Sequence, residues 1–322
     1  MNKVCFGCGS KLQTDKPGVT GFIPVHKKVD SKYCQRCYKL IHYGEVAETK
    51  APKQVKQIIN NINQDHKFVL FLTDFLSINS EVIKIFKSIK TPKMFIISKS
   101  DIIPKSVNIA NLKNTLKNEY GIKEDIKFVS SHTNYGVEAL INYLDYRKIN
   151  EAYIIGLSNA GKSNLINAMI DKLGSKTNKL TTSNSLNTTM DFIRIPLDEH
   201  LLLIDTPGFV LPSMEFKPFT IKAAIKPKVY QMKAGETLKI EDYAFGFSES
   251  TSVILYLPNE FKSAKYYKEV IFTDELRIND NEDIMINGLG FIQVKKSSNV
   301  KINGIDPQII EVRKTLLGAN HE

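Results

Sequence analysis

The chain has 322 residues, 42% of them hydrophobic, and its 44 Lys and Arg outnumber 34 Asp and Glu to give a formal net charge of +10. This length predicts two or three domains, with enough apolar residues to fill their cores. No apolar run approaches the roughly 20 residues that span a bilayer, and the first residues do not resemble a signal peptide. These features argue against a membrane or secreted protein and predict a soluble cytoplasmic one.

The positive charge is unevenly distributed. Residues 1–50 contain nine Lys and Arg against four Asp and Glu, and residues 217–235 contain five lysines and no acidic residue. Such local excess favours a polyanionic partner, most simply nucleic acid. A lysine-rich solvated face is the alternative.

The first 50 residues contain all four cysteines, in two Cys-x-x-Cys pairs: Cys5 with Cys8, and Cys34 with Cys37. Two such pairs supply four thiolates to one tetrahedral Zn²⁺. Two disulfides are the first alternative, but structural disulfides are rare in the cytoplasm. The second is a redox pair, which does not need a second copy. We therefore predict a closed structural zinc site, and the lysines and tyrosines around it suit RNA contact.

From residue 51 onward, helical and strand patterns alternate. Buried strands are predicted at 68–72, 93–97, 126–129 and 152–155, and helices at 52–64, 81–89, 108–120 and 137–146. This alternation is typical of a doubly wound α/β sheet that is mostly parallel, with binding sites at the carboxyl ends of its strands.

A phosphate-loop motif follows the strand at 152–155. The residues Gly156-Leu-Ser-Asn-Ala-Gly-Lys-Ser163 fit the pattern of two glycines four residues apart followed by Lys and Ser, and a helix is predicted at 164–173. Backbone N–H groups of such a loop bind phosphate at the helix N-terminus. Lys162 is expected to reach the terminal phosphates and Ser163 to ligate Mg²⁺. The nucleotide-binding residues predicted here are Gly156, Asn159, Ala160, Gly161, Lys162, Ser163 and Asn164.

Two further strands, predicted at 191–197 and 200–204, lead to a second phosphate-sensing motif, Asp205-Thr-Pro-Gly208. In nucleotide switches the Asp of this motif holds Mg²⁺ through water and the Gly N–H contacts the γ-phosphate. The polar stretch 175–189 contains five threonines and no packing pattern. It is predicted to be a mobile switch loop, with one Thr that closes on Mg²⁺.

A base-reading motif lies earlier in the chain. Ser98-Lys99-Ser100-Asp101 resembles Asn-Lys-x-Asp, with Asp101 as the carboxylate that reads guanine and Lys99 over the base. Ser130 and Ser131 resemble the loop that supports the guanine O6. In ordinary small GTPases these segments follow the phosphate loop, whereas here they precede it, which indicates a circular permutation.

Together, these motifs resemble the YqeH-like circularly permuted GTPases over essentially the whole chain. Further motifs that carry the resemblance are Tyr38-Lys-Leu-Ile-His-Tyr43, Asn187-Thr-Thr189 and Gly288-Leu-Gly-Phe291. The resemblance implies a zinc module at 1–50, a permuted G domain at 51–216 and a third domain at 217–322. It implies GTP hydrolysis to GDP with Mg²⁺, coupled to assembly of the small ribosomal subunit through contact with the subunit or its rRNA.

Four residues bear on how well the motifs work. Ser98 replaces the Asn of the base-reading motif, and its shorter side chain is expected to weaken contacts to the base and the phosphate loop. Thr189 matches the Mg²⁺-binding Thr of related GTPases, with Thr188 as the less favoured alternative. Phe209 stands where Ras-like enzymes have a water-orienting Gln, so slow hydrolysis is expected. Asn159 matches an Asn that ligates K⁺ in related enzymes, with a merely tolerated Asn as the alternative. Lys162, Asn159 and Thr189 are the predicted catalytic residues.

Residues 217–322 are predicted to form a mixed α+β domain. Strands are predicted at 237–240, 243–247, 252–257, 290–295 and 300–303, and helices at 263–271 and 307–317. Because this domain follows Asp205–Gly208 almost directly, loss of the γ-phosphate is hypothesised to reposition it, with 217–235 as lever or contact surface.

Two other functions stay open. A nucleotide-gated RNA-binding scaffold with negligible turnover is suggested by Phe209 and Ser98. A phosphate-loop ATPase is suggested by Ser98 alone and opposed by Asp101. GTP turnover stimulated by K⁺ separates the first from a GTPase, and base competition tests the second.

Overall fold

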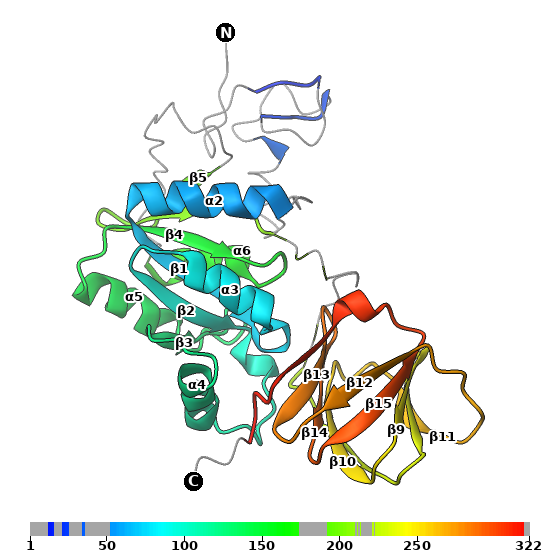
Figure 1. The fold of residues 1–322 in the computed structure, drawn as a ribbon. Helices are drawn as coiled ribbons and strands as arrows, with labels where there is room; N and C mark the ends of the chain where they lie inside the picture. Colours follow the sequence, from blue (N-terminus) through cyan, green and yellow to red (C-terminus); the bar gives the residue numbers. More distant parts are fainter. Residues whose placement is uncertain are drawn as a thin grey trace. The chain divides into compact units, whose positions relative to one another are not determined.

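The computed structural model describes residues 12–15, 21–25, 34–35, 52–173, 192–209, 211, 213, 221 and 223–318 (Figure 1). The chain divides into two compact units. One holds Met1–Asp74, Phe86–Ser100 and Glu124–Leu211, and the other Phe75–Ile85, Asp101–Lys123 and Pro212–Glu322. The domain boundaries expected from the sequence stay predictions. None of the described helices combines the length and the apolar character that crossing a bilayer requires.

The first unit is built on a six-stranded sheet with the order β3-β2-β1-β4-β6-β5. All neighbouring strands are parallel except β5 and β6, which are antiparallel. This confirms the predicted mostly parallel sheet. The strands are β1 (Phe68–Asp74), β2 (Lys93–Ser98), β3 (Ile126–Phe128), β4 (Glu151–Gly156), β5 (Ile193–Pro196) and β6 (Leu202–Asp205).

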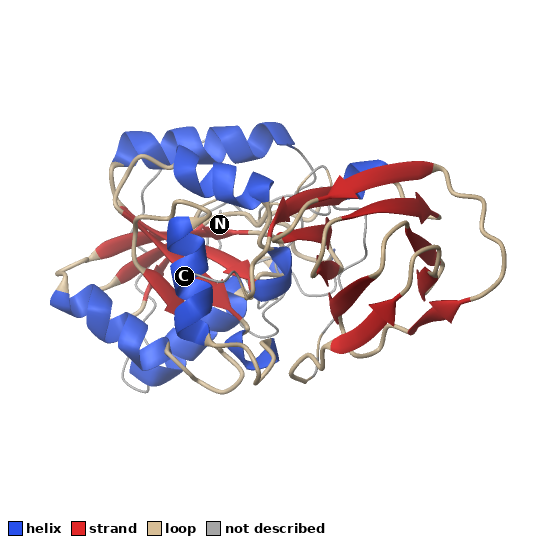
Figure 2. Ribbon diagram, turned by 60° about the horizontal axis from the view of Figure 1, so that its bottom comes forward, coloured by secondary structure: helices blue, strands red, loops and turns tan. Residues whose placement is uncertain are grey.

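Helices lie on both faces of this sheet, as Figures 1 and 2 show. Helix α2 (Pro52–Asp65) covers one face, while α5 (Val137–Tyr146) and α6 (Lys162–Leu173) pack together on the other. The apolar stripe of α2 is buried, as the helical spacing of Val55, Ile58 and Ile62 requires. The described residues also form α3 (Ser80–Ser88), most of which belongs to the second unit, and α4 (Ile109–Asn118), which lies in the second unit. All five helices predicted before residue 174 are thus confirmed within about two residues of their ends.

The second unit contains two antiparallel five-stranded sheets, β16-β13-β14-β10-β7 and β11-β8-β9-β15-β12. Apolar side chains from both sheets form one hydrophobic core, which includes Leu238, Phe245, Val253 and Ile292. The strands are β7 (Lys228–Met232), β8 (Thr237–Ile240), β9 (Tyr243–Phe247), β10 (Thr251–Tyr256), β11 (Ser263–Tyr266), β12 (Asp274–Ile278), β13 (Glu282–Ile286), β14 (Gly290–Val294), β15 (Ser298–Asn303) and β16 (Ile310–Lys314).

The predicted α+β character of residues 217–322 is wrong, because the described residues 223–318 contain strands and a 3-10 turn but no α-helix. The segment predicted as a helix at 263–271 begins with β11, which pairs with β8. In the other, at 307–317, a 3-10 turn capped by Asp306 leads into β16, which pairs with β13. The apolar spacing in both segments fits a helix, but their main chains instead form hydrogen bonds with the edge of a strand elsewhere in the chain. In the second segment, β-branched residues such as Ile310 and Val312 favour a strand.

A buried ion pair links β13 to β16 in the second unit. The side chains of Asp283 on β13 and Arg313 on β16 are almost inaccessible to solvent, and Arg313 Nη2 lies 3.8 Å from Asp283 Oδ2. The Arg313 guanidinium stacks on the Phe291 ring, 4.5 Å from its centroid, and donates to the main-chain carbonyl of Ile78. A charge so deeply buried requires its partner, so this pair is expected to be critical for the stability of the unit.

Next to Ile78 in the chain, Asn79 forms a buried pair of amide side chains with Asn287. Asn79 Nδ2 donates to Asn287 Oδ1 at 2.6 Å, and Asn79 Oδ1 accepts from the Val82 N–H at 2.8 Å. The ring of Phe75 lies edge-on to Phe291, with centroids 5.5 Å apart. The segment 75–82 is therefore fixed to β13, β14 and β16 by polar and aromatic contacts together.

Candidate nucleotide site

The phosphate-loop residues link the end of β4 to the start of α6, which is the context that the motif requires. A Cβ added to Gly156 would lie 2.2 Å from the Leu72 carbonyl oxygen, so glycine is required where β4 passes close to β1. Asn159 and Gly161 have φ angles of 64° and 82°, in the left-handed region. Asn tolerates this conformation better than most residues. The loop is therefore bent by its own backbone preferences.

Replacing Gly156 by Ala is expected to lower the free energy of unfolding by about 2 kcal/mol, because the new methyl group would force two paired strands apart. Urea unfolding followed by circular dichroism measures this. Gly161→Ala is the matched control, since a Cβ at Gly161 meets nothing within 4 Å and only its positive φ costs energy. An equal loss in the two variants would contradict the close-approach argument.

Lys162 and Ser163, the first residues of α6, are both buried, with 4% of each exposed. Lys162 Nζ lies 3.5 Å from the Gly156 carbonyl oxygen, so the amine folds back over the loop. The Ser163 hydroxyl is buried and has no hydrogen-bond partner among the described residues. A buried polar atom without a partner in the protein suits a hydroxyl that ligates a metal ion. Ser163 therefore fits Mg²⁺.

The Asp205–Gly208 segment runs beside the phosphate loop. Asp205, fully buried at the end of β6, pairs in register with Ile154 of β4. A Cβ on Gly208 would lie 2.9 Å from Lys162 Nζ, so these two residues are neighbours. The structure thus brings Lys162, Ser163, Asp205 and Gly208 together at the carboxyl ends of two adjacent strands, where the sequence predicts that phosphates bind.

Phe209 takes no part in the site through its side chain. It is buried, and its ring centroid lies 6.4 Å from that of Phe71. Its main chain, in contrast, is bonded to the phosphate loop: the Phe209 carbonyl accepts from the Ser158 N–H at 2.7 Å and its N–H donates to Gly156 at 3.3 Å. Phe209 is thus a core residue whose backbone supports the loop.

The base-reading segment is also in contact with the phosphate loop. The Ser98 hydroxyl lies 2.5 Å from the Ala160 carbonyl oxygen and 3.1 Å from that of Thr73, and donates between them. Although Ser is shorter than Asn, Ser98 thus reaches the loop. Lys99 has a φ of 50°, and its Nζ donates to Asp74 Oδ2 at 3.1 Å. Asp101 follows in the 3-10 turn Ser100–Ile102.

The loop after β3 is closed by hydrogen bonds around Ser130. The Ser130 N–H donates to the Tyr135 carbonyl at 2.9 Å and its hydroxyl accepts from the Thr133 N–H at 3.1 Å. Gly136 ends the loop with a φ of 72°, where a Cβ would lie 2.3 Å from the Phe128 carbonyl oxygen. Ser131 is half-buried in this loop. Because β3 is next to β2 and parallel to it, Ser130 and Ser131 lie after a strand that ends at the same edge of the sheet as the strand that contains Ser98.

Several predicted site residues lie outside the described residues: Thr189, Cys5, Cys8 and Cys37. Cys34 is described and buried. The part of the chain that the structure describes contains no cluster of His, Cys, Asp or Glu able to hold a metal. The zinc site and the Mg²⁺-binding Thr stay predictions.

Sequence reasoning missed Thr73 and Asp74 at the end of β1. Both contact the base-reading segment, Thr73 through its carbonyl and Asp74 through its carboxylate. Their signal was present, because parallel strands end at a common edge and the polar pair Thr-Asp directly follows the apolar run of β1.

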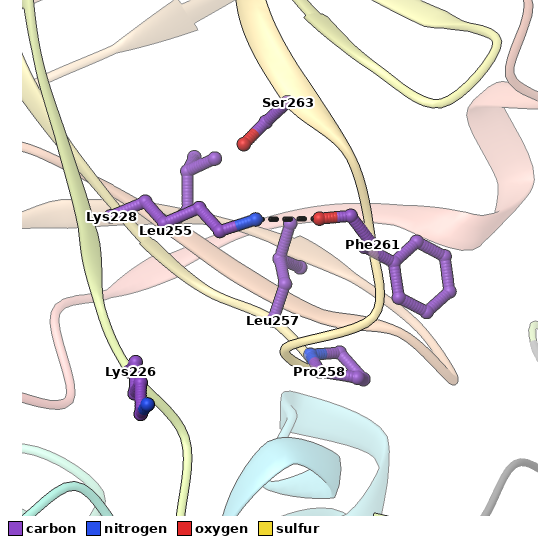
Figure 3. Close-up of a pocket in the computed structure, with 7 residues that line it drawn as sticks. All are labelled: Lys226, Lys228, Leu255, Leu257, Pro258, Phe261 and Ser263. Atoms are coloured by element: carbon purple, nitrogen blue, oxygen red, sulfur yellow. Dashed lines mark hydrogen bonds between the residues drawn. The ribbon is translucent and has the colours of Figure 1, made fainter.

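A recess in the second unit does not offer a comparable site (Figure 3). The side chain of Lys228 crosses it, and Lys228 Nζ donates to the Phe261 carbonyl at 2.6 Å. The remaining walls are largely apolar. The lining residues are Lys226, Lys228, Leu255, Leu257, Pro258, Phe261 and Ser263.

Comparison with known proteins places these motifs in context. Residues 46–215 match the family model described as RsgA GTPase, and residues 151–286 match the model described as 50S ribosome-binding GTPase. The uncharacterized protein YqeH of Bacillus subtilis is 30% identical over 80% of this chain and 76% of its own length. The probable ribosome biogenesis GTPase A of Mycoplasma genitalium is 27% identical, over 74% of this chain and 89% of its own. The nitric oxide-associated protein 1 of Mus musculus is 22% identical, and the match covers 60% of this chain and only 36% of that protein.

Proposed function

Because the chain belongs to the RsgA GTPase family and is YqeH-like, we propose that it is a switch in ribosome assembly whose GTP site is the one described above. The protein is a GTPase that hydrolyses GTP to GDP and phosphate. The observation that carries the proposal is the arrangement of Lys162 and Ser163 beside Asp205 and Gly208 at adjacent strand ends. The phosphate loop and the Asp205–Gly208 segment, which are two different phosphate-sensing motifs, lie side by side there.

Each motif residue has a proposed role in that site. Lys162 neutralises the terminal phosphates, and the Ser163 hydroxyl with Thr189 holds Mg²⁺, which supplies charge compensation for phosphoryl transfer. Asp205 acts on the ion through water and Gly208 senses the γ-phosphate. Asn159 ligates K⁺, and the four cysteines hold zinc. Ser98, Lys99, Asp101, Ser130 and Ser131 form the base pocket.

A circular permutation accounts for the chain order. The base-reading residues follow β2 and the phosphate loop follows β4, yet the strands lie in one sheet with β1 between them. Moving the chain ends leaves such a sheet unchanged while reversing the order of the motifs. Support for this proposal therefore comes from the sheet together with the sequence.

The proposed partner is the small ribosomal subunit or its rRNA, in the bacterial cytoplasm. The basic residues of 1–50 and 217–235 suit a polyanion. A relative is named as a ribosome biogenesis GTPase, and the family description of 151–286 refers to the 50S ribosome. Binding of isolated 30S and 50S subunits to the GTP-loaded protein decides between them.

The nucleotide is tested by displacement of a fluorescent guanine nucleotide with GDP, GTP, ADP and ATP, in Mg²⁺ and K⁺. We expect only guanine nucleotides to compete, whereas equal competition by adenine nucleotides would support the ATPase alternative. Phosphate release is then compared in KCl and NaCl. Slow turnover that rises in K⁺ is expected. Turnover below detection in both salts would favour the scaffold, for which the core position of Phe209 is the structural argument.

A further inference from the structure

We propose that Asp74 is a positioning residue for guanine recognition, because it holds the side chain of Lys99 at the base-binding edge of the sheet. This inference rests on the proposed function and adds a residue that lies outside the base-reading motif. Asp74 ends β1, while Lys99 directly follows β2, and the two strands are parallel neighbours in which Asp74 is in register with Ser98.

The backbone of the base-reading segment is fixed on three sides. The Ser98 hydroxyl bonds to Ala160 in the phosphate loop and to Thr73 in β1. The Ser100 N–H donates to the Val129 carbonyl at 3.0 Å, next to β3. Lys99 lies between these anchors in the left-handed region, where few non-glycine residues are found. The start of its side chain is therefore set by the backbone.

Asp74 fixes the other end of the same side chain. Lys99 Nζ lies 3.1 Å from Asp74 Oδ2, and the two side chains are 34% and 13% exposed. An unpaired lysine loses rotamer entropy when it is ordered. Because the ion pair orders the Lys99 side chain before a nucleotide binds, the base contacts an aliphatic chain that is already ordered. Preorganisation of this kind increases the affinity for the nucleotide.

A purely structural role predicts a different result. Partly exposed ion pairs contribute little to the stability of the fold. The loss of Asp74 is thus expected to leave the protein folded and to act on nucleotide binding. Because Asp74 acts through Lys99, its effect must vanish when the lysine is absent. A residue that merely supported the sheet would act in either background.

The test is a double-mutant cycle in the full-length chain with Asp74→Ala, Lys99→Ala and the double variant. GDP affinity is measured by displacement of the fluorescent guanine nucleotide, and folding by thermal denaturation. We expect Asp74→Ala to raise the Kd for GDP about 5- to 10-fold without loss of folding. The double variant is expected to match Lys99→Ala. Glu138→Gln is the control, because it breaks the exposed Lys172–Glu138 pair of the same unit, and no change is expected.

Two results would overturn the inference: an unchanged Kd in Asp74→Ala, or effects of Asp74→Ala and Lys99→Ala that multiply in the double variant. If Asp74→Ala unfolds, Asp74→Asn keeps the volume and removes only the charge, and the same cycle is measured with it. If the wild-type protein binds adenine nucleotides as well as guanine nucleotides, the proposed base pocket fails. That failure is read from the wild type alone and is distinct from a failure of the cycle.

Discussion

Replacement of Lys162 by Ala is expected to reduce GTP turnover about 10²- to 10³-fold, the loss usually seen when one preorganised charge-stabilising donor is removed from an active site. The amine is buried beside the loop, next to Gly208 and 3.5 Å from the Gly156 carbonyl. In the proposed site this amine would meet the phosphates where water is largely excluded, so its charge would be little screened. GTP affinity is expected to fall with turnover, because the same charge binds the ground state.

Single-turnover phosphate release and nucleotide displacement measure these two losses. Lys172→Ala is the matched control, since Lys172 lies at the other end of α6 with a side chain 40% exposed. Equal circular dichroism of both variants establishes that the helix is intact. If Lys162→Ala hydrolysed GTP at the wild-type rate, the phosphates would have to bind elsewhere and the proposed site would be wrong.

Replacement of Arg313 by Met is expected to lower the free energy of unfolding by about 3–5 kcal/mol, because it leaves the Asp283 carboxylate buried without its counter-charge. The variant also loses the bond to the Ile78 carbonyl, which anchors the segment 75–82. Urea unfolding measures the loss. Arg277→Met is the control, because Arg277 is 53% exposed and pairs with Glu249 at the surface of the same unit. A loss below 1 kcal/mol in Arg313→Met would show that the buried pair is dispensable.

The pH dependence of the same variant is a further expected result. Burial raises the pKa of Asp283 from 3.8 to about 6, although the neighbouring Arg313 lowers it. Because the folded state holds this proton more tightly than the unfolded chain, protonation of Asp283 stabilises the folded state. This stabilisation is fully present below about pH 4 and is lost as the pH rises through about 6. Without Arg313 the pKa rises further. Arg313→Met is therefore expected to be less destabilised at pH 5 than at pH 8.

The double variant Asp283→Asn with Arg313→Met tests the cause. Removing both charges eliminates the uncompensated carboxylate, so part of the stability is expected to return and the difference between pH 5 and pH 8 to shrink. An unchanged pH dependence in the double variant would point to another titrating group.

The sequence alone determined the nucleotide-binding half of the protein well. Its central strands β1, β2 and β4 are nearly continuous apolar runs that are buried on both faces, and its helices carry apolar residues at helical spacing, so these elements are encoded locally. The phosphate loop is encoded in the same way only in part, because the positive φ of Gly161 is a local requirement, whereas Gly156 is required by the close approach of Leu72 on the neighbouring strand. Because parallel strands end at a common edge of the sheet, the polar residues that follow these buried strands lie at that edge.

Only the tertiary structure decided the residues whose role depends on distant partners. The side chain of Phe209 faces the core rather than the phosphates because Phe71 lies beneath it, and Ser98 reaches Ala160, 62 residues away, because β2 ends near the phosphate loop. The ion pair of Asp74 and Lys99 arises from the register of two strands. None of these three contacts has a signature in the residues next to it in the sequence.

The same reason explains the wrong helices near the C-terminus. Residues 307–317 carry apolar side chains that fit either a helix or a strand, and the free edge of β13 selects the strand. Helices satisfy their hydrogen bonds within one segment and can be read from that segment, whereas strands depend on a partner elsewhere in the chain. The sequence therefore determined the α/β elements and the phosphate-loop motif between them, and the tertiary structure decided the strands of residues 223–318 and the contacts of Lys99.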